Sequence, residues 1–213
     1  MKIRTSEELV DRIDSDLVWR RAELTAFYGA AASASRIVQT ALLRGSVALL
    51  YAHWEGFVKE AAYYYLCFLA SKRLKTEQLR AEIAGLSMWS EMVAAAESRN
   101  PDLHTKIVRS LRDDSAKRAK IPNDKAAIRT ESNLSFRVFA AILSSIGLDS
   151  SIHESHRDLI DAELVAVRNR IVHGENETIA LPEWVELSAA VLAIMRDVAD
   201  QIQHAAVEKT YLI

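Results

Sequence analysis

Glycine and proline are scarce in this chain. Its 213 residues include six glycines and three prolines, where average usage of about 7% and 5% would give roughly 26 together. Because few turn-forming residues permit few turns, the secondary-structure elements must be long. This excludes a sandwich or barrel built from many short strands. It predicts an all-α fold, a helical bundle with long amphipathic helices.

The remaining composition is that of an ordinary globular protein. Half of the residues are hydrophobic and the formal net charge is −2, which excludes collagen-like and disordered classes. Cys67 is the single cysteine, so it has no partner for an internal disulfide and forms no metal site alone. The charged N-terminus leads into no signal-peptide core, and the most apolar stretch, residues 61–70, is far shorter than the roughly 20 residues that span a bilayer. We therefore expect a cytoplasmic protein.

Hydrophobic periodicity and capping signals predict the helices. Thr5 and Glu8 form a capping-box pattern at the start of the first helix, Gly147 and Gly174 end two later ones, and Pro182 opens the last. Residues 46–70 are apolar almost all round, which predicts burial on more than one face. We expect a single domain over 1–213, with its core at about 34–209. The predicted helices cover residues 6–28, 34–73, 76–84, 88–98, 102–111, 134–146 (capped by Ser132-Asn133), 151–172 and 182–208.

A basic segment interrupts this pattern at about 104–131, and we expect it to be an inserted loop region. Between 104 and 129 it holds eight lysines or arginines but three acids. Such a segment can follow a nucleic-acid backbone or form a solvated loop. It contains no aromatic residue, so it does not indicate sequence-specific readout by stacking. The candidate backbone-binding residues are Lys106, Arg109, Arg112, Lys117, Arg118 and Lys120.

Common catalytic motifs are missing from the sequence. There is no glycine-rich phosphate loop, H-E-x-x-H, C-x-x-C or G-x-S-x-G pattern. His153 and His156 lie three residues apart and could share a helix face, but no further ligands follow at metal-binding spacing. A metal-dependent site at this pair is therefore a weak alternative, and we expect no cofactor.

The segment Arg168-Asn169-Arg170-Ile171-Val172-His173-Gly174 carries a more informative pattern. An arginine and a histidine stand five residues apart at the end of an amphipathic helix, directly before the final helix. A second copy, Arg99 to His104, contains a proline at a predicted helix start. The copy at 168–173 resembles the R-x4–6-H signature of the HEPN superfamily, small helical proteins of which many are metal-independent ribonucleases.

The resemblance extends beyond this motif. Leu49 to Val58 (LLYAHWEGFV), Ser132-Asn133-Leu134 and Ile146 to Asp149 are similar to segments of a bacterial HEPN branch that is linked to toxin and phage-defence loci. The resemblance implies a HEPN-like fold and an endoribonuclease that leaves a 2′,3′-cyclic phosphate. It also implies a homodimer with a composite cleft, and a toxin or abortive-infection effector with an antitoxin or defence-system partner protein.

Arginine and histidine suit that chemistry. Histidine titrates near neutral pH, so it can take the proton of the attacking 2′-OH or protonate the leaving 5′-oxygen. A guanidinium stabilises the extra negative charge of the phosphorane. We therefore predict Arg168 and His173 as catalytic residues, supported by Asn169. Arg170 adds charge or faces solvent, and Glu55 orders an active-site arginine or lies on the surface; both questions stay open.

Geometry sets a condition on this site. Five residues of a regular helix rotate by about 500°, so Arg168 and His173 point apart by some 140°. They converge only if the helix ends near Val172, or if they act across a two-fold axis. The alternative is a helix end whose cations complement the helix dipole. In that case the protein is a non-catalytic helical module that binds partners or dimerises.

Overall fold

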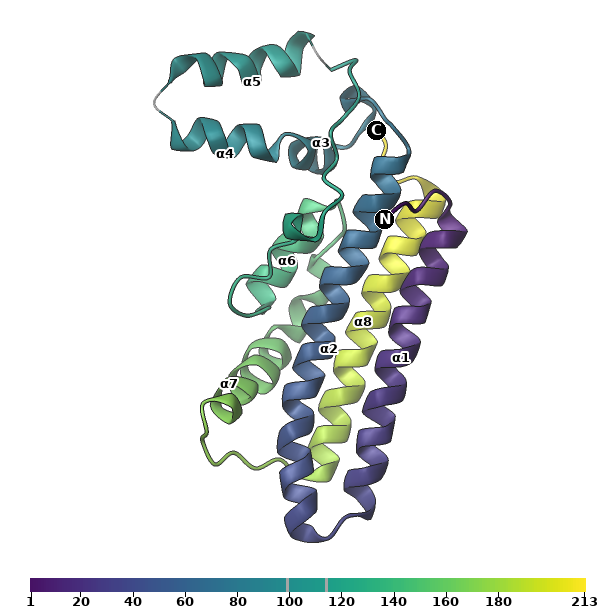
Figure 1. Cartoon of the computed structure of the whole chain (residues 1–213), viewed down its shortest axis with the longest axis vertical. Helices are drawn as coiled ribbons and strands as arrows, with labels where there is room; N and C mark the ends of the chain where they lie inside the picture. The colour runs from purple at the N-terminus through teal and green to yellow at the C-terminus, as the bar shows by residue number, and fades with distance from the viewer. Residues whose placement is uncertain (99, 114) are drawn as a thin grey trace.

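Three long helices form the body of the molecule. In the computed structural model, which describes residues 1–98, 100–113 and 115–213, α1 (Ser6–Ser33), α2 (Arg36–Ser71) and α8 (Leu181–Glu208) lie side by side (Figure 1). At 1.5 Å per residue, α2 is about 54 Å long. Thr5 caps α1 as predicted, because its Oγ1 accepts a hydrogen bond from the Glu8 amide at 3.1 Å. The all-α prediction is confirmed.

α1 is longer than predicted. The predicted end at residue 28 is wrong, because α1 continues through Gly29 to Ser33. A glycine inside a helix costs about 1 kcal/mol, and the alanines that follow are the best helix formers. The chain reverses direction only at Ala34 and Ser35, which have extended backbones.

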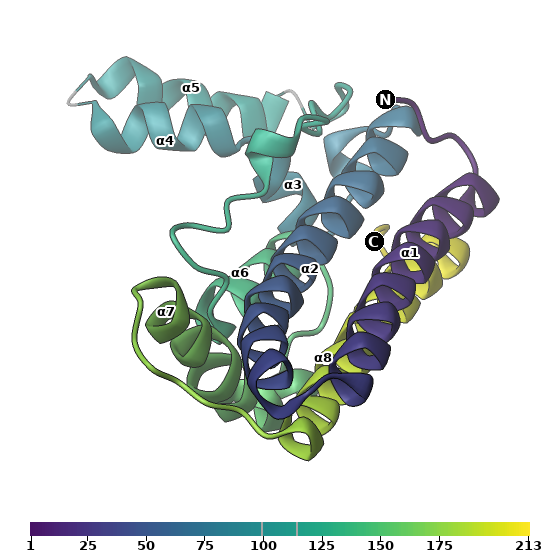
Figure 2. The ribbon, with the colours of Figure 1, turned by 60° about the horizontal axis from the view of Figure 1, so that its bottom comes forward.

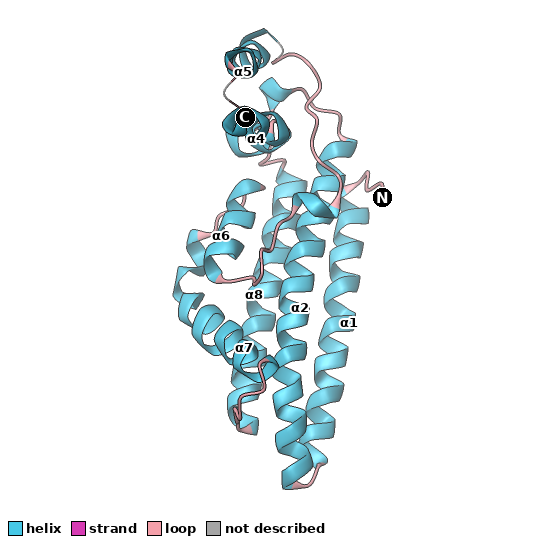
Figure 3. Ribbon diagram, turned by 60° about the vertical axis from the view of Figure 1, so that its left-hand side comes forward, coloured by secondary structure: helices cyan, strands magenta, loops and turns pink. Residues whose placement is uncertain are grey.

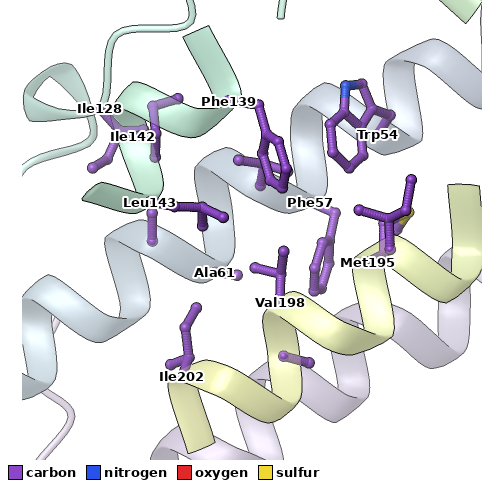
Figure 4. Close-up of a cluster of buried hydrophobic side chains, with 14 of the residues drawn as sticks. Trp54, Phe57, Ala61, Ile128, Phe139, Ile142, Leu143, Met195, Val198 and Ile202 are labelled. Atoms are coloured by element: carbon purple, nitrogen blue, oxygen red, sulfur yellow. The ribbon is translucent and has the colours of Figure 1, made fainter. Parts of the chain in front are cut away.

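The core surrounds the second half of α2. Figure 4 shows Trp54, Phe57 and Ala61 of α2 between side chains from two other helices. This confirms the predicted burial of residues 46–70 on more than one face, here by the rest of the same chain. The labelled neighbours are Phe139, Ile142 and Leu143 from α6 (Phe136–Ser145), Met195, Val198 and Ile202 from α8, and Ile128 from the segment before α6.

A helical hairpin projects from one end of the bundle. After η1 (Thr76–Gln78) and α3 (Ala81–Ser87), helices α4 (Trp89–Glu97) and α5 (Pro101–Asp113) run side by side away from α2 (Figure 2). We call α4 and α5 the arm. His104 joins the two helices, because its Nε2 lies 2.9 Å from the carbonyl oxygen of Ala95.

An irregular segment returns from the arm to the bundle. It passes through η2 (Lys125–Ala127) and then residues 128–135, which we call the strap, before α6 begins. The predicted cap of α6 is wrong. Ser135 rather than Ser132-Asn133 caps the helix, and its Oγ accepts from the Val138 amide at 3.5 Å. The side chain of Asn133 is used elsewhere, as described below.

The segment predicted as one helix over 151–172 contains three helical geometries. A 3₁₀ stretch, η3 (Ser151–His156), precedes a π-helical stretch, η4 (Leu159–Val165), and α7 (Ala166–Val172) follows. α7 packs against α2 (Figure 3). The amide of Ala166 donates to the carbonyl of Asp161, five residues earlier. A π-helical turn is wider than an α-helical turn, so it changes the angle at which α7 presents its side chains to α2. Such turns are frequent at functional sites.

The final helix begins as predicted, with Pro182 in its first turn. In the described residues, strand-like pairing is limited to two isolated bridges, Lys75 with Arg118 and Leu79 with Leu212. Within the same residues, every helix is too short or too polar to cross a membrane.

Candidate functional site

α7 ends where the glycine pattern predicted. Gly174 has φ +85°, in the left-handed region that favours glycine. Its amide donates to the Ile171 carbonyl at 3.1 Å, and the next amide, of Glu175, donates to the Arg170 carbonyl at 3.0 Å. This pair of hydrogen bonds is a Schellman motif. It places His173 at the C-cap, directly after the last residue of α7, with its side chain exposed.

Two arginines hold the loop that follows. Arg170 pairs with Glu177, and Nη2 of Arg44 on α2 donates to the Glu175 carbonyl at 2.7 Å. Arg170 therefore supports the loop beside the helix end. The position of His173 is defined by the backbone on both sides, although its side chain is open to solvent.

Arg168 is held by three groups. Its Nη1 donates to Oδ1 of Asn133 at 2.9 Å and to Oδ1 of Asn169 at 2.7 Å. Its Cζ lies 4.2 Å from the centroid of the Tyr51 ring, a cation–π distance. The half-buried guanidinium is thus fixed between α2, the strap and its own helix. Asn169 therefore contacts Arg168, and its supporting role in catalysis stays a prediction.

Tyr51 belongs to a larger network between α2 and the strap. Its hydroxyl accepts the Leu134 amide at 2.8 Å, and Nε1 of Trp54 donates to the Leu134 carbonyl at 3.2 Å. Glu55 accepts from Oγ1 of Thr130 at 2.7 Å. Both backbone groups of one strap residue are therefore bound by α2 side chains. Glu55 reaches Arg168 through Tyr51, with which it is also hydrogen-bonded.

The hydroxyl of Tyr51 stays protonated at neutral pH. Burial is the main cause that raises its pKa to about 12, and the hydrogen bond with Glu55 contributes in the same direction. A group with this pKa is a poor general base near pH 7. Tyr51 therefore acts as a platform for the Arg168 guanidinium and as an anchor for the strap.

Arg168 and His173 do not meet within one chain. Among the described residues, no hydrogen bond or ring contact joins the two side chains. The backbone explains this, because the His173 amide still makes the helical hydrogen bond to the Asn169 carbonyl at 3.0 Å, and the chain leaves helical geometry only at the His173 ψ of 4°. The helical rotation therefore persists to His173, and the helix end at Val172 does not turn the imidazole towards the guanidinium.

Part of the basic segment lies at the C-terminal end of α2. Nη2 of Arg118 donates to the Ala70 carbonyl at 3.2 Å, whereas Arg168 rests on Tyr51. The two anchor points are 19 residues apart on one helix, or about 28 Å along its axis. Arg112 is exposed on α5. The other five predicted backbone-binding residues, Lys106, Arg109, Lys117, Arg118 and Lys120, line a cavity of about 710 Å³.

The weaker histidine candidates have different surroundings. His153 is fully buried, with Nε2 3.1 Å from Nε2 of Gln201, and its ring centroid lies 6.1 Å from that of His156. In the part of the chain that the structure describes, no three or more His, Cys, Asp or Glu residues are placed to hold a metal ion. Of the second R-x4-H copy, Arg99 lies outside the described residues, and His104 contacts the Ala95 carbonyl.

Sequence reasoning missed three residues of the Arg168 environment as functional groups: Tyr51, Asn133 and Thr130. Tyr51 and Asn133 lie within two segments of the HEPN resemblance, Leu49–Val58 and Ser132–Leu134, whereas Thr130 lies outside these segments and had no such signal. These segments lie about 80 residues apart in the sequence. The structure brings both to the same guanidinium.

The helical bundle, with an arginine and a histidine at the end of its penultimate helix, defines a HEPN-type module. Within that class, the chain belongs to the MAE_28990-like HEPN family, whose sequence pattern matches residues 9–211. No curated protein and no solved structure gives a significant match to the chain.

Proposed function

We propose that the protein is a metal-independent endoribonuclease of the HEPN type. The observation that carries this proposal is the unequal pair at the end of α7. Arg168 is a half-buried guanidinium with a fixed position, and His173 is an exposed imidazole on a fixed backbone. Helix-dipole complementation does not account for Arg168, because its hydrogen bonds go to two asparagine side chains rather than to terminal carbonyls.

The proposed reaction uses the RNA's own 2′-OH as the nucleophile. The 2′-oxygen forms a bond to phosphorus and loses its proton to a histidine, while the bond from phosphorus to the 5′-oxygen breaks and that oxygen gains a proton. The products are a 2′,3′-cyclic phosphate and a 5′-hydroxyl. His173 moves the protons, and Arg168 stabilises the negative charge on the phosphoryl oxygens.

A second copy of the chain completes the site in this proposal. One chain leaves Arg168 and His173 without contact, and a two-fold axis near the end of α7 would place the His173 of each copy opposite the Arg168 of the other. By family resemblance, the dimer acts as a toxin or phage-defence effector that an antitoxin or defence partner restrains.

The test is cleavage of single-stranded RNA in excess EDTA by the wild type, Arg168→Ala and His173→Ala. We expect the wild type to release a 2′,3′-cyclic phosphate, His173→Ala to lose about 10²–10⁴-fold in rate and Arg168→Ala to lose about 10²–10³-fold. Arg21→Ala is the matched control, since Arg21 is an exposed cation on α1, and it should cleave like the wild type. Equal cleavage by all variants, or none by a folded wild type, would contradict the proposal and favour a non-catalytic HEPN module.

A further inference from the structure

A hollow of about 550 Å³ lies between the start of the arm, the segment that enters the strap and α6. Its lining holds one large aromatic side chain, Trp89, two cations, Lys120 and Arg129, and two acids, Asp124 and Glu131. Apolar side chains such as Val138 and Ile142 complete it. Neither Trp89 nor Arg129 belongs to the catalytic environment described above.

Both acids of this hollow already have partners, because Asp124 accepts the Ala126 amide at 2.6 Å and Glu131 pairs with Arg137. Trp89 is 53% exposed, and both Lys120 and Arg129 are exposed. Across the described residues, no hydrogen bond, ion pair or ring contact engages these three side chains. An exposed indole offers a flat face on which a nucleic-acid base can stack, and free cations beside it suit the phosphates on either side of that base.

The hollow continues into the positively charged cavity of about 710 Å³ described above. The two share Ser87 and Lys120. Five cations line that cavity against two acids, Glu91 and Asp102. Because a polyanion gains from each phosphate that a cation neutralises, the charge of the adjoining surface suits a nucleic-acid strand that leaves the hollow towards the arm.

The strap connects the hollow to the candidate active site. Arg129 lines the hollow, the next residue, Thr130, binds Glu55, and Asn133 binds Arg168. The four Cα–Cα steps from residue 129 to residue 133 span at most about 14 Å even when fully extended. At roughly 3.4 Å per stacked nucleotide, a strand that starts at Arg168 reaches the hollow within about four nucleotides.

We propose that this hollow is a base-binding subsite for single-stranded RNA. One base stacks on Trp89, and the adjoining phosphates contact Lys120 and Arg129. The inference rests on the proposed ribonuclease function and narrows its substrate to RNA with an unpaired base near the cleavage point, because only an unstacked base can lie against the indole. The subsite supplies the aromatic group that the basic segment lacks in its own sequence.

The experiment measures RNA binding in the non-cleaving His173→Ala background. A fluorescently labelled 12-nucleotide single-stranded RNA of mixed sequence is titrated with the parent and with further variants, and the anisotropy gives the dissociation constant. Trp89→Ala should weaken binding by about 5- to 150-fold, the range measured when one stacking residue is removed. Trp89→Tyr should restore most of the affinity. Lys120→Ala and Arg129→Ala should each weaken binding and lower its salt dependence.

Two controls keep the result specific. Arg21→Ala removes an exposed cation from α1 and should bind like the parent. A fully base-paired RNA of the same length should bind the parent and Trp89→Ala equally, because it presents no free base. Equal affinities of parent and Trp89→Ala for the single strand would overturn the subsite. Failure of the parent to bind the single strand would also overturn the subsite. A Trp89→Ala variant that changes only the oligomeric state would overturn it too, and would identify the hollow as a contact between copies of the chain.

This outcome is separable from that of the proposed function. Trp89-dependent binding together with a wild type that fails to cleave RNA would sustain the subsite and contradict the nuclease. If cleavage depends on Arg168 and His173 but the affinity for RNA is the same with and without Trp89, the nuclease function would be sustained and the subsite contradicted.

Discussion

Arg168 and His173 stand five residues apart on one helix, yet their surroundings are opposite. The guanidinium of Arg168 is half-buried and engaged by two asparagine oxygens and the Tyr51 ring. The imidazole of His173 projects into solvent from a helix end that is fixed only through its backbone.

The difference indicates what one chain can preorganise. A charge that stabilises a transition state is most effective when its position is set before the substrate arrives, and the fold sets it for Arg168. A group that must transfer protons to and from a substrate needs access, and the fold leaves His173 accessible. In the proposed enzyme, the substrate and a second copy bring the two together.

Removal of the support for Arg168 should produce the largest effect among variants outside the catalytic pair. Asn133→Ala deletes one acceptor and leaves the guanidinium free to shift, and a shift of about 1 Å can cost up to 100-fold in rate. We expect RNA cleavage to fall by about 10- to 100-fold, measured as initial rate in EDTA.

A conservative variant separates positioning from folding. Asn133→Asp keeps an oxygen for Arg168 and should restore most of the rate, whereas Asn123→Ala, at an exposed asparagine, should not change it. Wild-type cleavage by Asn133→Ala, or a loss that Asn133→Asp fails to restore although the variant is folded, would show that this contact does not position Arg168.

The helix end below His173 gives the next largest effect. A Cβ added at Gly174 or at Gly29 would meet no atom within 4 Å, so both sites have room for alanine. Of these two glycines, only Gly174 has a positive φ, +85°. Gly174→Ala should therefore lower the free energy of unfolding by about 1–2 kcal/mol and reduce cleavage. Gly29→Ala, inside α1, should raise it by up to about 1 kcal/mol. Urea denaturation measures both, and equal signs would contradict the assigned helix end.

The smallest effect concerns a buried histidine, in contrast to the exposed His173. Burial lowers the pKa of His153, and His156 acts in the same direction against Asp149 and Asp197. As pH falls below about 6.5, the unfolded chain therefore takes up a proton on His153 while the folded chain does not, and stability decreases.

The free energy of unfolding should fall by no more than about 1.4 kcal/mol per pH unit for this group. His153→Gln should flatten the decrease between pH 6.5 and the lowered folded-state pKa, as measured by urea denaturation at each pH. Burial and Arg20 also lower the pKa of His53. His53 therefore contributes its own share of the stability lost at low pH, and the His153→Gln variant keeps that share. An unchanged slope in His153→Gln would show that His153 does not contribute.

Local sequence signals predicted much of the fold. Thr5, Gly174 and Pro182 act on backbone groups within a few residues, so their effect can be recognised from neighbours alone. The apolar character of residues 46–70 predicted the centre of the core, and the R-x4-H pattern identified the end of α7.

Contacts between distant segments could not be predicted in the same way. Tyr51 binds the amide of Leu134, 83 residues away, and Asn133 binds Arg168, 35 residues away. No local pattern encodes such pairs, and Asn133 even resembled a helix cap. The π-helical turn before α7 and the approach of Trp89 to Arg129 likewise depend on packing.

The central claim, a site that two copies complete, can be tested by complementation. Arg168→Ala and His173→Ala chains carrying different tags are co-expressed, and the heterodimer is purified through both tags. Two-fold symmetry leaves it one intact Arg168–His173 pair across the axis, so we predict about half of the wild-type cleavage rate in EDTA, while each variant homodimer is nearly inactive. A heterodimer no more active than the two homodimers, or failure of the chains to associate, would contradict the account.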